Sequence, residues 1–388
     1  MFMKKFILTL TLSFCVFSIQ FGQIQTGAEQ TKKYFPFLEN KNIALVVNQT
    51  STIGAIHLVD SLINSNFKIK KVFAPEHGFR GTADAGEHVK NHIDTKTGLP
   101  IISLYGNNKK PTKEQMAGID LVIFDIQDVG VRFYTYISTM HYVMEICAEE
   151  HIPFLVLDRP NPNGNYIAGP VLQLKFQSFV GLHPIPIVHG LTVGELAKMI
   201  NKEKWLKNEK SCDLTIIKCE NYDHNSQYTI PIKPSPNLPN DLSISLYPSL
   251  CLFEPTEVSI GRGTYFPFQV AGTPQGEQVG NFTFTPKSIE GMSKHPKHEN
   301  KLCYGIDFRE NTSSRFNLEA LILFYQNSKD KSKFFTSTSF FNQLVGNNEL
   351  IEKIKKGDSY EKIEKSWNAQ LKEYLILRSK YLLYPDFN

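Results

Sequence analysis

Acidic side chains stand directly after three apolar runs of this 388-residue sequence. Glu76 and Glu87 lie in one polar segment, and Asp128 and Asp158 each follow another apolar run. Two carboxyl groups that flank a bond, one protonated and one ionised, are what hydrolysis of a glycosidic bond requires. The pattern therefore favours carboxylate chemistry of this kind.

Each acid also has a purely structural explanation. Glu76 stands near Arg80, and Asp128 stands near Arg132, so either pair could form a salt bridge that orders its own loop. For a single acid the two explanations are equally open. Three acid-rich loops at neighbouring strand ends favour a shared site.

Aromatic and histidine side chains accompany the acids. Tyr134 and its neighbours supply rings that suit the apolar C–H faces of sugars, although some of these rings must belong to the core. His77, His88 and His92 suggest a metal site, but their spacing matches neither HExxH nor its inverse. His189 follows another apolar run and could orient a substrate hydroxyl or bond a local carbonyl.

One arginine in the second half of the chain stands between two glycines. The glycines let the backbone turn tightly at Arg262, and an arginine can bind a carboxylate through two parallel hydrogen bonds. Arg262 could therefore meet an anionic ligand in a cleft. The alternative is a structural pair with Glu254 or Glu257.

Apolar, β-branched runs bounded by turn residues predict the strands that position these side chains. The runs are residues 43–47, 69–73, 100–104, 121–124 and 154–157. Helical patterns between them, at 56–63, at 137–150 and after a capping box at Thr192, imply a doubly wound, mostly parallel α/β sheet. Ligands of such sheets bind beyond the carboxyl ends of the strands, where the acids stand.

The residue pattern changes after about residue 210. Prolines cluster there, and short strand-like pieces appear at 214–218 and 281–285. We expect residues 24–210 to form the α/β domain and residues 211–388 a smaller α+β domain. Helical patterns in the second domain lie at 318–325, 339–345, 350–355 and 363–384.

Residues 1–23 have the pattern of a secretory signal peptide, with two lysines before the apolar run 6–17. Cleavage near Gly22 or Gln23 would leave an exported, periplasmic protein. No later stretch reaches the roughly 18 apolar residues of a membrane span. Lipid anchoring through Cys15 is the alternative, although a bulky residue precedes it where a lipidation box has a small one.

Composition and motifs exclude other classes of function. The 42 Lys and Arg nearly balance the 38 Asp and Glu, so no nucleic-acid partner is expected. No GxGxxG or P-loop follows a strand, so no nucleotide cofactor is expected, and the GxSxG elbow of α/β-hydrolases is missing. We expect the cysteines after the leader to be buried thiols, with a Cys212–Cys219 disulfide as the alternative.

Five long motifs of the sequence resemble the exo-β-N-acetylmuramidase NamZ family. They are PEHGFRG at 75–81, DIQDVGVRFYTY at 125–136, DRPNP at 158–162, PNLP at 236–239 and EPTEVSIGRGT at 254–264. Ser366, Trp367 and the YLLY at 381–384 are similar to the tail of that family, so the likeness covers the mature chain. One departure is KPSP at 233–236, where a more apolar lead-in is expected.

The resemblance implies a Rossmann-like domain and a smaller C-terminal domain that closes the active-site cleft. It also implies an exo-acting glycosidase that removes N-acetylmuramic acid (MurNAc) from the non-reducing end of peptidoglycan fragments, in cell-wall turnover or scavenging. The expected partners are peptidoglycan-derived disaccharides, such as MurNAc-GlcNAc (GlcNAc, N-acetylglucosamine), or muropeptides. No cofactor and no metal are implied.

Carried onto this sequence, the resemblance assigns the acid/base work to Glu87 and Glu76, with Asp128 as a third candidate. A cation must meet the lactyl carboxylate of MurNAc, and the candidates are Arg132, Arg159 and Arg262. The other expected substrate-binding residues are His77, Arg80, Tyr134, Asp158, Asn161, His189 and Glu257.

Two functions of other classes stay open beside the glycosidase. Two α/β domains around a cleft would suit a periplasmic binding protein for muropeptides or sugars equally well. A metal-dependent hydrolase that uses His77, His88 and Glu76 is the third hypothesis, and chelation would abolish its activity.

Overall fold

The larger of two domains is built on a seven-stranded sheet. The computed structural model describes residues 22–80, 91–310 and 315–387. The five predicted strands are β1 (Asn42–Val47), β4 (Lys68–Ala74), β6 (Pro100–Ser103), β7 (Leu121–Asp125) and β8 (Phe154–Leu157). The strand order is β5-β6-β4-β1-β7-β8-β9, and only the edge strand β5 (His92–Ile93) runs antiparallel to its neighbour. The expected mostly parallel α/β fold is therefore confirmed.

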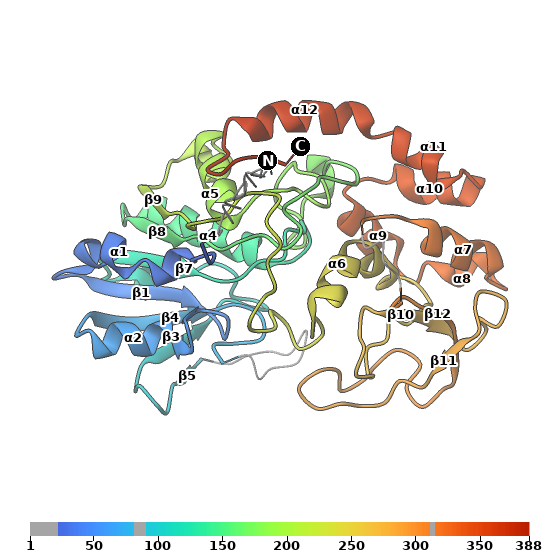
Figure 1. Ribbon diagram of the computed structural model, residues 1–388, viewed down its shortest axis with the longest axis horizontal. Helices are drawn as coiled ribbons and strands as arrows, with labels where there is room; N and C mark the ends of the chain where they lie inside the picture. The colour runs from blue at the N-terminus through green and yellow to red at the C-terminus, as the bar shows by residue number, and fades with distance from the viewer. Residues whose placement is uncertain (1–21, 81–90, 311–314, 388) are drawn as a thin grey trace, which may run out of the picture.

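Helices cover both faces of this sheet (Figure 1). Ile43, Leu45 and Val47 of β1 pack into one core with α1 (Thr31–Leu38) and α2 (Leu58–Asn64). Ala44 and Val46 pack into the other core with α4 (Tyr136–Glu149) and α5 (Val193–Lys202). Because side chains alternate between the faces of a strand, a continuous apolar run is needed to fill both cores.

Short elements complete the first domain. The expected helix at 56–63 begins as a two-residue strand, β3 (Ile56–His57), which pairs with β2 (Thr52–Ile53) and leads into α2. The brief helix α3 (Lys113–Met116) precedes β7. A capping box at Thr192 opens α5, as predicted.

The sheet continues beyond residue 210, where we expected the first domain to end. Strand β9 (Leu214–Ile217), which we had assigned to the second domain, pairs in parallel with β8 and forms the edge of the sheet. In contrast, the apolar run 185–188 forms no strand of the sheet, and its Val188 makes only isolated bridges to Val131 and Ala168. Pro186 lies within this run and has no backbone N–H to donate to a neighbouring strand.

The second domain combines a small sheet with helices. Its antiparallel strands are β10 (Val270–Thr273), β11 (Phe282–Phe284) and β12 (Cys303–Asp307), in the order β10-β12-β11. Its helices are α6 (Asp241–Leu250), α7 (Glu319–Asn327), α8 (Lys331–Phe334), α9 (Thr338–Val345) and α10 (Glu349–Lys356). The expected smaller domain with strands and helices is present.

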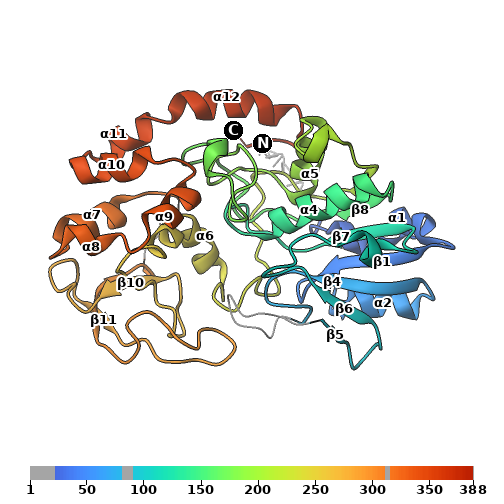
Figure 2. The ribbon, with the colours of Figure 1, turned by 180° about the vertical axis from the view of Figure 1, so that it is seen from behind.

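The C-terminal segment returns to the first domain. The single helix expected at 363–384 is instead two, α11 (Tyr360–Lys365) and α12 (Asn368–Ser379), and buried Trp367 stands at the break. Helix α12 spans from the second domain to the first in both ribbon views (Figures 1 and 2). Beyond it, Tyr384 is buried against the first domain.

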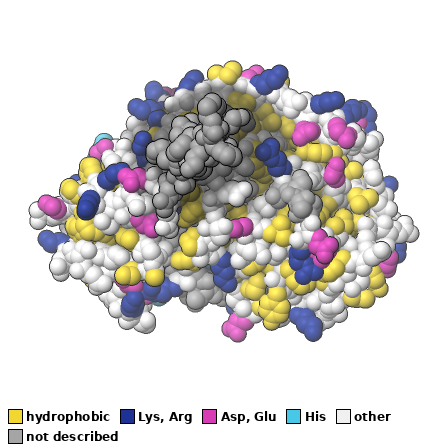
Figure 3. Space-filling view, in the orientation of Figure 1, with side chains coloured by type: hydrophobic (Ala, Val, Ile, Leu, Met, Phe, Trp, Pro, Cys, Tyr) yellow, Lys and Arg dark blue, Asp and Glu magenta, His cyan; other side chains and the backbone are white. Residues whose placement is uncertain are grey.

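The five cysteines of the described residues are all buried free thiols, so the Cys212–Cys219 disulfide is not formed. Within those residues, no helix has the length and apolar character to cross a bilayer. Basic and acidic side chains are interspersed on the face shown in Figure 3. The expected signal segment lies almost wholly outside the described residues.

Candidate active site

A cavity of about 670 Å³ lies between the two domains. Its lining from the first domain is Glu76, Tyr105, Phe133, Thr135, Phe179 and Val180. Its other lining residues are Tyr247, Cys251, Glu254, Arg262, Met292, Ser293, Lys294, His295, Phe340 and Leu344. A second pocket of about 80 Å³ shares five of these residues and extends toward Asn237. The larger volume is in the range of small-molecule sites.

Glu76 follows β4 and reaches this cavity from the first domain. The Thr135 hydroxyl, which lies beyond β7, donates a hydrogen bond of 3.2 Å to Oε2 of Glu76. Tyr105 follows β6, the neighbour of β4, and its hydroxyl also bonds to Glu76. Burial, and then the Glu76 carboxylate, raise the pKa of Tyr105 well above its ordinary value. Two hydroxyls therefore hold the carboxylate in the cavity.

His77, next to Glu76, has an unusual backbone conformation. Its φ is 69°, in the left-handed region that non-glycine residues seldom adopt, and its side chain is buried. His77 lines the smaller pocket together with Glu76. A strained conformation beside Glu76 is consistent with a functional position, and the substrate-binding role of His77 stays a prediction.

Arg262 and Glu254 form an ion pair on the wall that the second domain supplies. Both Nε and Nη2 of Arg262 contact Oε1 of Glu254, at 2.7 and 2.6 Å, and the guanidinium lies 5.0 Å from the ring centre of Phe268. The pair with Glu254 that we considered is therefore present. Glu257 instead accepts a hydrogen bond of 2.6 Å from Ser328 and does not line the cavity.

Aromatic rings from both domains meet beside the carboxylate. Tyr134 packs edge-on against Tyr136 and against Tyr247 of α6, with ring centres 4.8 and 5.7 Å apart. Phe133 contacts Tyr247 in the same way at 5.5 Å. Tyr136 also lines the smaller pocket, and its hydroxyl donates to the Pro234 carbonyl. Tyr134 and Phe133 line the smaller pocket, as a sugar-stacking role requires.

Asp128 is buried and does not line either pocket. Its Oδ2 accepts a hydrogen bond of 2.7 Å from the Gly130 amide, while Oδ1 has no hydrogen-bond partner among the described residues. Burial raises the pKa of Asp128 to about 7, although the amide of Gly130 acts in the opposite direction. The Asp128 side chain is therefore a buried group behind the cavity lining and not part of the lining itself.

Two arginines have partners other than those considered from sequence. Arg80 pairs with Asp94 at 2.9 Å, and not with Glu76, and it lies over the ring of Phe79. Arg132 is fully buried and donates to four backbone carbonyls, with no Asp128 pair. Neither arginine lines the cavity, so their expected contact with substrate has no support in the geometry.

The polar residues that follow β8 are buried and do not line either pocket. Arg159 binds Asp125 through two hydrogen bonds of 2.6 and 3.0 Å. Asp158 accepts from the Thr192 hydroxyl at 2.7 Å and from the Tyr384 hydroxyl at 2.6 Å. Burial raises the pKa of Asp158 to about 6. Asp158 thus joins the first domain to the C-terminal segment, whereas Arg159 stays within the first domain. A position at a strand end fixes the edge of the sheet but not the direction of the side chain.

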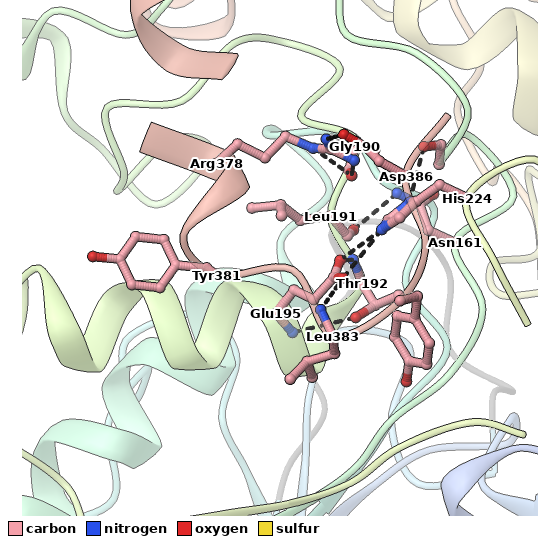
Figure 4. A network of polar contacts seen from close by, with 12 residues as sticks. Asn161, Gly190, Leu191, Thr192, Glu195, His224, Arg378, Tyr381, Leu383 and Asp386 are labelled. Carbon is pink, nitrogen blue, oxygen red and sulfur yellow. Dashed lines mark hydrogen bonds and ion pairs between the residues drawn. The ribbon is translucent and has the colours of Figure 1, made fainter. Parts of the chain in front are cut away.

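Asn161 and His189 belong to the same buried region, of which Figure 4 shows a part. Asn161 Nδ2 donates to the Leu191 carbonyl at 2.9 Å. Burial lowers the pKa of His189 to about 3, and its carbonyl accepts from Tyr374 of α12. Neither side chain lines the cavity. We had expected both to bind substrate. The structure instead bonds Asn161 to the loop at Leu191 and bonds the His189 carbonyl to α12.

A further set of bonds in Figure 4 fixes the C-terminal segment. Arg378 donates through Nε and Nη2 to the Gly190 carbonyl and pairs with Asp386 at 2.7 Å. Glu195 accepts from the Leu383 amide at 2.8 Å and contacts His224 at 3.1 Å. These contacts hold α12 against the first domain.

Some cavity residues were not found by sequence reasoning. Tyr105 follows the predicted strand 100–104, so the rule that ligands bind beyond strand ends could have found it. Tyr247 and the segment 292–295 carry no such signal. Glu87 and His88 lie outside the described residues. Among the residues that the structure describes, no group of three or more His, Cys, Asp or Glu side chains has a metal-binding arrangement.

Comparison with known proteins gives a consistent result. Residues 43–242 match the family model for exo-β-N-acetylmuramidase NamZ, N-terminal, and residues 245–384 match the model for its C-terminal part. The peptidoglycan β-N-acetylmuramidase NamZ of Bacillus subtilis (strain 168) is 39% identical over 383 residues, which cover 93% of this chain and 92% of that protein.

Crystal structures of two DUF1343 family proteins from Bacteroides fragilis are similar to this fold. One is 47% identical with a TM-score of 0.87, covering 94% of this chain and 100% of the other. The second is 30% identical with a TM-score of 0.75, covering 93% of this chain and 99% of the other. The likeness thus extends over both domains.

Proposed function

Because the chain belongs to the NamZ family of exo-β-N-acetylmuramidases and is a glycoside hydrolase, we propose that it hydrolyses the β-1,4 bond of a non-reducing-end MurNAc in peptidoglycan fragments such as MurNAc-GlcNAc. The observation that carries this proposal is that Glu76 and Arg262, from different domains, line one cavity. A carboxylate and a guanidinium in one pocket match a sugar that itself bears a carboxylate.

The catalytic work falls to carboxyl groups in this proposal. Glu76 and Glu254 both line the cavity, and Glu254 is paired with Arg262. We assign the catalysis to Glu76, with Glu87 from the same segment as its partner, so that one protonates the leaving oxygen while the other acts as base or nucleophile. Asp128 remains a third candidate. Its buried carboxyl has a pKa raised to about 7, which allows it to hold a proton at neutral pH.

Arg262 is the cation that meets the lactyl carboxylate of MurNAc. Of the three arginines considered, Arg132 is occupied by four carbonyls and Arg159 by Asp125, whereas Arg262 lines both pockets. Its two bonds to Glu254 both go to one oxygen through Nε and Nη2. The remaining nitrogen, Nη1, is the donor that we assign to the substrate. His77 and Tyr134 border the sugar ring.

We further propose that the protein is exported and acts in cell-wall turnover or scavenging. The apolar leader with its two lysines supports export, and the substrate is found outside the cytoplasmic membrane. Mass spectrometry of the mature protein tests this part: an N-terminus near Gly22 supports cleavage of a signal peptide, and an intact Met1 contradicts it.

The activity is tested with two disaccharides of opposite sequence. Purified protein is incubated with MurNAc-β-1,4-GlcNAc and with GlcNAc-β-1,4-MurNAc, and the products are followed by mass spectrometry. We expect MurNAc to be released from the first and the second to stay intact. Cleavage of the second alone, or binding of the first without cleavage over hours, would contradict the proposal.

A further inference from the structure

Arg132 holds three separate segments of the chain together. Its Nη1 donates to the carbonyls of Pro170 and Ile185, at 2.8 and 2.6 Å. Its Nη2 donates to the carbonyls of Leu344 and Val345, at 2.8 and 2.7 Å, which are the last two residues of α9. One guanidinium therefore joins the segment after β7 to the loop 170–185 and to the second domain.

This cation is buried without an acidic partner among the described residues. Its side chain is fully inaccessible, and burial alone lowers the pKa of Arg132 to about 9. A buried charge without a counterion is costly, and the carbonyls at the C-terminal end of a helix offset part of that cost through their negative partial charge. This arrangement indicates that Arg132 fixes the relative positions of these segments, because apolar residues would stabilise the core without the cost of burying a charge.

The segments that Arg132 joins form the walls of the cavity. In the first domain, Phe133 and Thr135 follow it directly and line the cavity, and Thr135 holds Glu76. In the second domain, Phe340 and Leu344 of α9 line the same cavity. Arg132 thus connects the wall that carries Glu76 with a wall on the other side, although it does not itself line the cavity.

The residue after α9 is a glycine, and its lack of a side chain leaves space for the Arg132 guanidinium. Gly346 has a φ of 84°, and a Cβ at this position would lie 2.9 Å from Nη2 of Arg132 and 2.9 Å from the Leu172 Cα. Gly357, after α10, has nearly the same φ of 83° with nothing within 4 Å of its Cβ position. Both glycines have the same backbone conformation, but only at Gly346 would a side chain also collide with neighbouring atoms.

We propose that Arg132 is a positioning residue that fixes the two walls of the cavity relative to each other and so sets the substrate affinity. The proposal rests on the proposed function, because it takes this cavity as the place where the sugar binds. Arg132 makes no contact with substrate. It acts through Thr135 on one wall and through the end of α9 on the other.

Arg132→Lys tests the proposal, with Arg378→Lys as a matched control. A lysine keeps the charge, but its single nitrogen cannot serve four carbonyls in two directions. Arg378 is equally buried and also donates to a backbone carbonyl, but no residue of its helix α12 lines the cavity. We expect both variants to melt at lower temperature, whereas KM for MurNAc-GlcNAc rises about tenfold only in Arg132→Lys.

The KM distinguishes a displaced cavity wall from a loss of protein stability alone. Partial unfolding reduces the amount of active enzyme and lowers apparent kcat, but it leaves KM unchanged, whereas a displaced wall raises KM. If Arg132→Lys does not fold, Gly346→Ala replaces it and Gly357→Ala becomes the control. Equal KM values in a test variant and its control overturn the proposal.

Hydrogen exchange gives a readout that needs no substrate. We expect Arg132→Lys to increase amide exchange in 133–135 and 343–346 together, while Arg378→Lys leaves both segments protected; unchanged protection in Arg132→Lys overturns the proposal. A wild-type protein that releases no MurNAc would remove the proposed function. The exchange experiment would still decide whether Arg132 holds the walls.

Discussion

The Thr135 hydroxyl donates a hydrogen bond to Oε2 of Glu76, so a residue beyond β7 fixes the carboxylate that follows β4. These strands are not neighbours, because β1 lies between them in the sheet. The orientation of Glu76 therefore depends on the packing of three strands and not on its own loop.

Replacing Glu76 by Gln should lower kcat/KM on MurNAc-GlcNAc by at least about 10², because the amide cannot exchange a proton with the leaving oxygen or with water. The melting temperature should stay close to that of the wild type, since Glu76 is only partly buried. Glu114→Gln, at an exposed position of α3, is the control. Unchanged turnover in Glu76→Gln would remove this residue from the mechanism.

Replacing Thr135 by Val keeps the shape of the side chain and removes its hydrogen bond to Glu76. A hydrogen bond to a charged group contributes about 1.5–3 kcal/mol, so we expect kcat/KM to fall about tenfold or more. Thr283→Val, on an exposed position of β11, serves as the control. Steady-state kinetics with equal activities for both variants would show that the hydroxyl does not orient the carboxylate.

Replacing Arg262 by Met should weaken the preference for a sugar with a lactyl group. We expect KM for MurNAc-GlcNAc to rise at least about tenfold, because a charged partner of the substrate carboxylate is lost, while binding of GlcNAc-GlcNAc changes little. Arg309→Met is a close control, since Arg309 also pairs with an acid, Asp307, and lies over a ring, that of Phe266. An equal effect on both disaccharides would argue against lactyl recognition.

Asp128 should make the protein less stable as the pH rises from about 4 to about 7. Burial raises its pKa from 3.8 to about 7, so the folded protein holds a proton in this range that the unfolded chain releases. The associated stability is present below pH 4 and is lost through pH 7, by at most about 4 kcal/mol. In Asp128→Asn, melting temperatures measured between pH 4 and 8 should fall less steeply; an identical slope would show that Asp128 does not titrate here.

Replacing Tyr384 by Phe should lower the free energy of unfolding by about 1–3 kcal/mol, because Asp158 loses a buried donor at 2.6 Å. Urea unfolding followed by circular dichroism measures the change. Tyr265→Phe is the control, because Tyr265 is 84% exposed. If both variants unfold at the same urea concentration, the C-terminal segment does not stabilise the first domain through this bond.

The strands of the first domain were predictable because each fills two cores. The run 121–124 became β7, whose residues are all buried, and no amphipathic pattern was needed. The run 185–188 is also apolar, but it contains Pro186, which has no backbone N–H to donate to a neighbouring strand. The break near Trp367 was also missed, since the apolar pattern of 363–384 continues through it and only the burial of Trp367 shows where the helix ends.

The candidate site was predictable only as far as the edge of the sheet. Glu76 reaches the cavity from a strand end, while Asp158 and Arg159, from an equivalent position, turn beneath it toward partners distant in sequence. Arg132 shows the same limit, because its four acceptors are carbonyls, which every residue carries. Side-chain type could not distinguish a residue that meets the ligand from one that holds the walls.

The contact between Tyr384 and Asp158 joins residues 226 positions apart, and it has a consequence for how the molecule folds. A ribosome completes the seven strands of the sheet well before it reaches Tyr384, so the emerging first domain has a buried carboxyl without its hydroxyl donor. Contacts of such long sequence separation form late and slow the folding of a chain. The first domain therefore acquires this hydroxyl donor only after the whole second domain has been synthesised.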